Sequence, residues 1–252
     1  MDSAARAPGQ GSPLGSGGNE ASTSVAVRNM FAVVAQRYDF LNHFLSLGRD
    51  IAWRRAAARA LKDVLARPGS RVADLCCGTG DLSFCLSRHS HGLVLGADFC
   101  RPMLAIARGK SGGHSRRAHF LEADALRLPF ADASLDAVTS AFGFRNLANY
   151  DRGMEEMRRV LRRGGRLAIL EFSQVRGPIF GPLFRFYFRR VLPRIGVWIS
   201  GVEGPYSYLP DSVSNFPEQE ILAEKLRAAG FHNVNYVNFT GGVAALHVGE
   251  KG

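Results

Sequence analysis

Cysteines, acidic residues and long apolar runs are all scarce in this chain, and each shortage excludes a class of protein. Only four cysteines occur in 252 residues, and none of them forms a Cys-x-x-Cys pair. This argues against a zinc site and predicts buried, reduced thiols. No stretch of about twenty uninterrupted apolar residues is present, so we expect no transmembrane helix.

The shortage of acidic side chains leaves the chain strongly basic. There are 32 Lys and Arg against 22 Asp and Glu, which gives a formal net charge of +10. Such a balance favours an anionic partner, either a nucleic acid or an anionic membrane surface. Apolar residues make up 46 % of the chain, enough for the core of one α/β domain of this length.

Large apolar residues are almost missing from residues 1–24, which are rich in Gly, Ser and Ala. We interpret residues 1–24 as a disordered tail and residues 25–252 as a single domain. The tail lacks the apolar core of a secretory signal, and its one Arg is too few for a transit peptide. The expected location is therefore the cytoplasm.

Residues 71–81 carry the most informative pattern. An apolar run ends in Gly-Thr-Gly at positions 78–80, and a helical segment begins at once. Such glycines allow the backbone to pass close to a ligand, where a Cβ would collide. The third glycine of the dehydrogenase fingerprint is replaced by Ser83, and Asp81 at the helix start would repel a pyrophosphate. The pattern therefore favours a nucleotide-like ligand without phosphates.

Two further predicted strands end in a carboxylate. Residues 92–99 are expected to form a buried strand that ends at Asp98, and residues 118–125 a strand that ends at Asp124. In a Rossmann-type site, the carboxylate after the second strand holds ribose hydroxyls. Asp98 could also serve as a helix N-cap or a solvated loop residue. The repetition of such strand ends at βα spacing favours the cofactor site.

The rest of the chain alternates strands with helices and closes on a hairpin. Strands are expected over 135–142, 166–172, 231–239 and 243–248, and helices over 102–108, 151–161 and 217–229. Gly241 and Gly242 between the last two strands are a hairpin signal. This order predicts an α/β, Rossmann-like class I methyltransferase fold, with a mostly parallel seven-stranded sheet and a C-terminal antiparallel hairpin.

Arginines and aromatic residues cluster in residues 177–200. On a helix, one apolar stripe would form, with Arg185 and Arg189 on the opposite side and Pro193 ending or kinking the helix. The stripe consists of Phe180, Phe184, Tyr187, Phe188 and Val191. This pattern suits a membrane surface or a lipophilic substrate, and it equally suits a helix that packs on the core with its arginines in water.

Several segments together resemble the ubiquinone/menaquinone biosynthesis C-methyltransferase family, over about residues 30–251. The most specific are Phe-Gly-Phe-Arg-Asn at 142–146, Val-Leu-Pro-Arg-Ile-Gly at 191–196 and Gly-Val-Ala-Ala-Leu-His at 242–247. Members of the family often carry a hydroxyl residue just before Phe-Gly. This chain has Ala141 there, which is a departure from the pattern.

The resemblance implies transfer of the S-adenosylmethionine methyl to a ring carbon of a prenylated quinol, without a metal. Demethylmenaquinol is the preferred acceptor, and the methoxy-polyprenyl-benzoquinol of the ubiquinone branch is the alternative. The implied catalytic residues are Arg145 and Asn146; Arg145 would orient the quinol oxygen or a water and stabilise the phenolate. The implied cofactor contacts are Gly78, Thr79, Gly80, Asp98, Asp124 and Ala125.

The same resemblance assigns roles to two helical regions. Residues 25–65, which include Tyr38 and Asp39, are expected to form a lid. Residues 174–215 are expected to form an insertion that meets the lipophilic substrate. Within this insertion, residues 177–200 are expected to contact the inner face of the cell membrane.

Three other functions compete with this interpretation. A nucleic-acid methyltransferase would suit the charge, but the motif after the fourth strand differs from the Asn/Asp-Pro-Pro-aromatic pattern of amino-directed enzymes, so we expect no nucleic-acid partner. A small-molecule O-methyltransferase fits the same physics. A non-catalytic S-adenosylmethionine-binding subunit is the third alternative. Whether the chain forms a homodimer is left open by the sequence.

Overall fold

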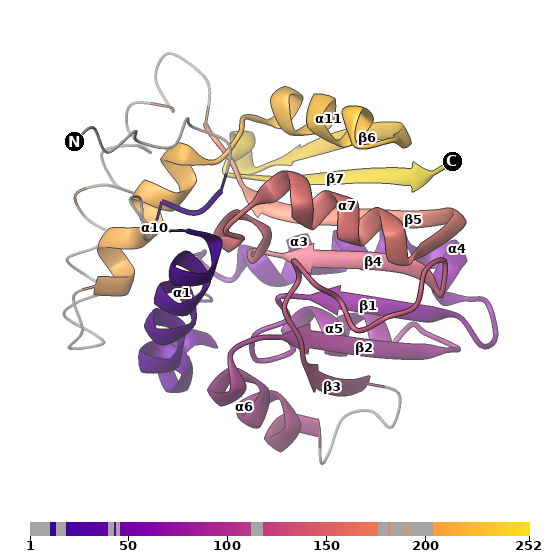
Figure 1. The fold of residues 1–252 in the computed structure, drawn as a ribbon, viewed down its shortest axis with the longest axis horizontal. Helices are drawn as coiled ribbons and strands as arrows, with labels where there is room; N and C mark the ends of the chain where they lie inside the picture. The colour runs from indigo at the N-terminus through magenta and orange to yellow at the C-terminus, as the bar shows by residue number, and fades with distance from the viewer. Residues whose placement is uncertain are drawn as a thin grey trace.

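The computed structural model describes residues 11–13, 19–39, 43, 46–111, 118–175, 181, 190 and 204–252. At its centre lies a seven-stranded sheet in the order β3-β2-β1-β4-β5-β7-β6 (Figure 1). The strands are β1 (Arg71–Leu75), β2 (Leu93–Asp98), β3 (Ala118–Glu122), β4 (Leu135–Ala141), β5 (Leu161–Phe172), β6 (Phe231–Phe239) and β7 (Ala244–Lys251).

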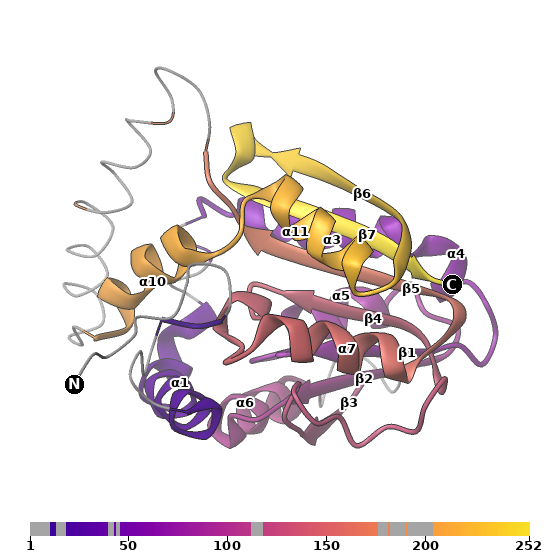
Figure 2. The ribbon, with the colours of Figure 1, turned by 45° about the horizontal axis from the view of Figure 1, so that its top comes forward.

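Helices cover both faces of this sheet and one of its edges. They are α1 (Glu20–Val34), η1 (Ala35–Arg37), α3 (Arg49–Ala60), α4 (Lys62–Leu65), α5 (Asp81–Ser87), α6 (Arg101–Ser111), η2 (Phe144–Asn146), α7 (Tyr150–Val160), α10 (Gly204–Asn215), α11 (Gln219–Ala228) and η4 (Thr240–Gly242). In Figure 2, α7 and α11 lie in front of the sheet, and α3 and α5 lie behind it.

Side chains along the central strands point alternately to the two faces of the sheet, which explains why helices cover both faces. In β1, Val72 packs with α3, α4 and α5 in one buried cluster, whereas Ala73 and Leu75 pack with α7 and α11 in the other. Successive side chains of a strand point to opposite faces, so a strand that is apolar throughout requires a helix layer on each side. The sequence therefore places the sheet in the middle of the molecule.

The predicted fold class is confirmed. β1, β2, β3, β4 and β5 pair in parallel, and β7 pairs antiparallel with both β5 and β6. The hairpin signal is confirmed as well, because η4 at 240–242 connects β6 to β7. The fifth strand begins at Leu161, earlier than predicted, because Leu161 pairs with Leu135 ahead of a register shift.

The N-terminal region differs in part from the prediction. α1 begins at Glu20, inside the range 1–24, because the side chain of Asn19 accepts a hydrogen bond from the backbone N–H of Ser22 and caps the helix. Residues 11–13 are also placed against the domain. The predicted helix at 180–191 lies outside the described residues, apart from positions 181 and 190.

The carboxyl ends of the parallel strands meet at one edge of the sheet, which is where ligands sit in open α/β folds. α1 and α10 lie over this edge, on the left in Figure 1. None of the helices in the described part of the chain is long and apolar enough to cross a membrane.

Candidate active site

The loop after β1 is held in a backbone conformation that glycine favours. Gly78 has φ +55° and Gly80 has φ +88°, and Gly80 is the N-cap of α5. A Cβ on Gly80 would lie 2.8 Å from Cζ of Phe120. The glycines at 78 and 80 are therefore required by backbone geometry, and Gly80 also by close packing.

Asp98 ends β2 and faces this loop. Its Oδ2 accepts the backbone N–H of Gly78 at 2.8 Å, and its Oδ1 accepts that of Cys100 at 2.8 Å. Burial raises the pKa of Asp98 to about 6, although the backbone N–H groups favour the charged form. Asp98 thus links the second strand to the glycine loop.

Asp124 follows β3 in a tight turn. Its Oδ1 accepts the backbone N–H of Leu126 at 2.9 Å, which fixes the direction of the chain past Ala125. Ala125 and Leu126 are buried, at 7 % and 5 % exposure. The turn ends the third strand at Glu122, ahead of the predicted limit at residue 125.

A cavity of about 50 Å³ opens between these segments. Among the predicted site residues, its lining includes Gly78, Asp98, Asp124, Ala125 and Asn146. Its apolar walls include Phe99, Met103 and Leu126, which can hold a flat ring.

The charges that line this cavity match S-adenosylmethionine. Among the described lining residues there are two carboxylates, from Asp98 and Asp124, and no Lys or Arg. A pyrophosphate would lack a counter-charge in such a cavity. A sulfonium cation without phosphates gains from it, so the residues present fit the cofactor.

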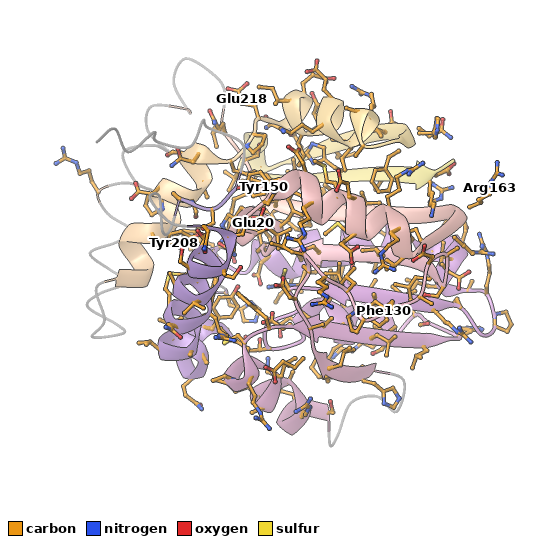
Figure 3. All side chains as sticks on the ribbon, viewed as in Figure 1. Glu20, Phe130, Tyr150, Arg163, Tyr208 and Glu218 are labelled. Atoms are coloured by element: carbon orange, nitrogen blue, oxygen red, sulfur yellow. The ribbon has the colours of Figure 1, made fainter. Side chains whose placement is uncertain are left out.

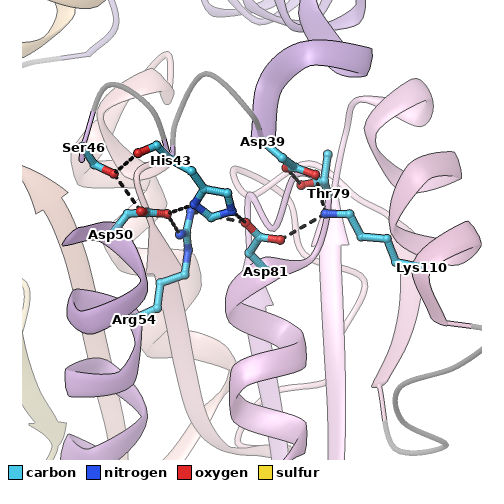
Figure 4. A network of polar contacts seen from close by, with 8 residues as sticks. All are labelled: Asp39, His43, Ser46, Asp50, Arg54, Thr79, Asp81 and Lys110. Carbon is cyan, nitrogen blue, oxygen red and sulfur yellow. Dashed lines mark hydrogen bonds and ion pairs between the residues drawn. The ribbon is translucent and has the colours of Figure 1, made fainter. Parts of the chain in front are cut away.

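Thr79 points to a different partner. Its hydroxyl donates a hydrogen bond to Oδ1 of Asp39, whose other carboxylate oxygen pairs with Nζ of Lys110 at 2.5 Å. Lys110 also binds Asp81 at 3.0 Å. Thr79 is thus joined to the N-terminal segment that precedes α3, as Figure 4 shows.

This network continues on the side of α3. Nδ1 of His43 lies 2.7 Å from Asp50, and Asp50 also pairs with Arg54. Burial raises the pKa of Asp50, but the hydrogen bond from Ser46 and the charge of Arg54 more than offset this, and the pKa ends below its ordinary value. Arg54 and His43 each lie 3.7 Å from Asp81 at the start of α5.

Arg145 lies in η2 just after β4 and is buried, at 5 % exposure. Its Nη1 donates to Oε1 of Glu171 at 2.8 Å and to the carbonyl of Phe142. Burial lowers the pKa of Arg145, but the charge and hydrogen bond of Glu171, together with Tyr38 and Tyr208, more than offset this and leave the pKa above its ordinary value. Arg145 is not among the residues that line the cavity around Asp98.

Asn146 does line the cavity, and both ends of its amide are held. Its Oδ1 accepts from the hydroxyl of Tyr208 at 2.9 Å, and its Nδ2 donates to the carbonyl of Phe142 at 3.4 Å. Tyr208 comes from α10, which approaches α1 at this edge of the sheet (Figure 3).

Glu171 and Tyr208 had no predicted role from the sequence. An acid directly after the apolar run at 167–170 was the available signal for Glu171. No local pattern marks Tyr208, because its partner Asn146 lies 62 residues away along the chain.

Two histidines, His43 and His247, could act as bases by residue type, but they lie elsewhere. His43 belongs to the network of Figure 4, and Nε2 of His247 lies 2.8 Å from the carbonyl oxygen of Gln219. Burial lowers the pKa of His247. Neither residue lines the cavity around Asp98.

Comparison with solved structures shows the same fold. The [4+2]-cyclase SpnF matches with a TM-score of 0.66 and 18 % identity, over 98 % of this chain and 99 % of its own. A phosphoethanolamine N-methyltransferase 2 of Haemonchus contortus, solved with S-adenosyl-L-methionine, matches with a TM-score of 0.55 and 15 % identity, over 77 % of this chain and 52 % of its own. At such identities, the likeness concerns the fold alone.

Sequence relatives are much closer. A demethylmenaquinone methyltransferase of Deinococcus radiodurans is 49 % identical and covers 93 % of this chain and 96 % of its own length. One of Thermus thermophilus is 51 % identical and covers 88 % and 100 %. A ubiquinone/menaquinone biosynthesis C-methyltransferase of Geobacter sulfurreducens is 42 % identical and covers 90 % and 88 %.

The ubiE/COQ5 methyltransferase family matches residues 19–251, which include every strand of the sheet and the whole cavity around Asp98. This match and the identity of the relatives over most of their length show that the chain belongs to the ubiE/COQ5 methyltransferase family and is an S-adenosylmethionine-dependent methyltransferase.

Proposed function

We propose that this enzyme methylates a ring carbon of demethylmenaquinol and so forms menaquinol. The observation that carries this proposal is the pair of relatives named demethylmenaquinone methyltransferase, at 49 % and 51 % identity over nearly their whole length. The relative from Geobacter is named for both quinones. Its name favours a second acceptor, the methoxy-polyprenyl-benzoquinol of the ubiquinone branch.

The cofactor, when bound, supplies an electrophilic sulfonium methyl. Asp98 accepts hydrogen bonds from the ribose hydroxyls, and Asp124 and Ala125 flank the adenine. The backbone at Gly78 and Gly80 lets the methionine part approach, and Thr79 anchors the glycine loop to Asp39. These roles agree with the position of Asp98 at the end of β2 and with the lining of the cavity.

A ring carbon becomes a better nucleophile when the neighbouring phenol loses its proton. A guanidinium does not accept that proton at ordinary pH. Arg145 lies outside the cavity lining, next to Asn146 in the chain, so it acts at a distance: its charge stabilises the phenolate, and it orients a water that takes the proton. Asn146, on the cavity wall, donates or accepts a hydrogen bond at the quinol oxygen. The ion pair with Glu171 holds Arg145 in one rotamer while that charge is needed.

Two segments enclose the substrate in this proposal. Residues 25–65 form a lid, which is supported by Tyr38 on the cavity wall and by the bond between Asp39 and Thr79. Residues 174–215 shelter the prenyl tail and, through 177–200, meet the membrane surface. The contact of Tyr208 with Asn146 supports the nearness of this second segment to the reaction.

A methyl-transfer assay tests the proposal. Purified protein is given labelled S-adenosylmethionine with demethylmenaquinol or methoxy-polyprenyl-benzoquinol, both kept reduced. We expect label in menaquinol. Label in the second product alone would move the function to the ubiquinone branch. Binding of the cofactor without transfer to either acceptor would refute the proposal and favour a non-catalytic subunit or another acceptor.

An Asn146→Ala variant tests the assigned site within the same assay. We expect turnover to fall by about 100-fold, since a hydrogen bond at the reacting oxygen contributes on that order. The affinity for S-adenosylhomocysteine should change far less. Unchanged turnover in a folded variant would remove Asn146 from the mechanism.

A further inference from the structure

We propose that Ser12 is a positioning residue of the active site, and that residues 11–13, here termed the N-terminal strap, hold the loop that forms one wall of the cavity. The strap lies before residue 19, where the match to the family begins. The catalytic part of the proposal rests on the proposed function.

The strap docks through its backbone. The N–H of Ser12 donates to the carbonyl of Leu147 at 2.8 Å, and Ser12 is only 2 % exposed. A Cβ on Gly11 would lie 2.1 Å from the carbonyl oxygen of Ala148, so only glycine permits this approach. Leu147 and Ala148 line the cavity, and the strap therefore buttresses its wall.

The side chain of Ser12 completes a chain of hydrogen bonds. Its Oγ lies 2.9 Å from the hydroxyl of Tyr208, and that hydroxyl donates to Oδ1 of Asn146 at 2.9 Å. A phenol has one proton, and Tyr208 gives it to Asn146. Ser12 must then be the donor to Tyr208.

The order of donors and acceptors along these hydrogen bonds is stable. Burial raises the pKa of Tyr208, so its proton stays in place. Asn146 donates in turn to the carbonyl of Phe142, which also accepts from Arg145. Ser12 and Tyr208 thus fix the orientation of the Asn146 amide, and with it the atom that remains available to the cavity. They act on the reaction only through Asn146.

A double-mutant cycle tests this order of action. We expect Tyr208→Phe and Ser12→Ala each to lower kcat for demethylmenaquinol by about five- to tenfold, the scale of one hydrogen bond. KM for S-adenosylmethionine should change little. The double variant should be no slower than Tyr208→Phe, because Ser12 acts through the lost hydroxyl. Effects of the two substitutions that multiply would overturn the proposal.

Gly11→Ala tests the docking itself, with Gly109→Ala as the matched control. Nothing lies within 4 Å of a Cβ on Gly109, in contrast to Gly11. We expect Gly11→Ala to reproduce the loss of kcat seen in Ser12→Ala, and Gly109→Ala to retain wild-type turnover. Wild-type kcat in Gly11→Ala would contradict the role of the strap.

Hydrogen exchange separates failure of this proposal from failure of the proposed function. In the full-length protein, the Ser12 amide should exchange slowly, because it is bonded to Leu147. In Gly11→Ala that protection should be lost, whereas Gly109→Ala should keep it. This readout needs no quinol. Fast exchange in the wild type would overturn the strap even if menaquinol is formed.

Discussion

At the scale of single residues, two buried acids, Asp98 at the end of β2 and Asp74 in β1, make the stability of the fold depend on pH. Burial raises the pKa of Asp98 to about 6 and that of Asp74 to about 7. Both groups therefore hold a proton in the folded state at pH values where the unfolded chain has released it. Their contribution to stability grows as the pH falls from about 7 towards about 4. Binding of a ligand that requires an ionised Asp98 has the opposite pH dependence, because it weakens as the pH falls.

We predict that affinity for S-adenosylhomocysteine falls as the pH drops through about 6, approaching tenfold per pH unit below that value. The reason is that a protonated Asp98 can accept fewer hydrogen bonds from the ribose. Titration calorimetry between about pH 7.5 and about pH 5 measures the effect. Asp98→Asn should bind more weakly and lose the pH dependence. A wild-type affinity that is flat over this range would contradict the assignment.

At the scale of elements, β2 owes its position to a missing side chain. A Cβ on Gly96 would lie 2.5 Å from Cδ1 of Phe120 on β3 and 2.9 Å from Oγ of Ser83 on α5. Ser83 in turn donates to Asp74 at 2.5 Å. One methyl group at position 96 would therefore disturb both the pairing of two strands and a buried hydrogen bond.

We predict that Gly96→Ala lowers the free energy of unfolding by about 1–3 kcal/mol, the usual cost of overpacking a tight core. Chemical denaturation monitored by circular dichroism provides the measurement. Gly109→Ala, where a Cβ meets open space, is the matched control and should be at least as stable as the wild type. Equal stability of the two variants would show that β3 or α5 yields at little cost.

At the scale of the whole molecule, the net charge of +10 favours an anionic partner or surface. The cavity around Asp98 does not account for it, because no Lys or Arg is among its described lining residues. An enzyme whose acceptor carries a prenyl tail has a reason to approach an anionic bilayer, where arginines and aromatic residues bind together. Residues 177–200 have that composition.

We predict that the protein binds anionic vesicles and that the combined Phe184→Ser and Phe188→Ser variant binds them at least tenfold more weakly, since two large apolar side chains no longer enter the interface. Vesicle co-sedimentation measures this. The matched control replaces Ile221 and Val237, which are exposed at 48 % and 57 %. Equal vesicle binding by this variant and by the control would show that residues 177–200 do not contact the membrane.

Local patterns in the sequence determined the fold class and the region of the cofactor site. Apolar strands that alternate with amphipathic helices predict a parallel sheet, because each pattern depends on near neighbours along the chain. The glycine loop and the strand-end carboxylates were predicted for the same reason: the sheet brings its carboxyl ends to one edge. Gly78, Asp98, Asp124 and Ala125 are indeed gathered around one cavity.

The side chains that support that site are defined by long-range packing. The hydrogen-bonded partners are far apart along the chain. The separation is 26 residues for Arg145 and Glu171, 40 residues for Thr79 and Asp39, and 196 residues for Ser12 and Tyr208. No periodicity links such pairs, because they are brought together by the order of strands and by α1 and α10 covering one edge of the sheet. The elements and the class of chemistry follow from local sequence patterns, whereas the hydrogen bonds that hold Arg145 and Asn146 in place follow from burial and from contacts between distant segments.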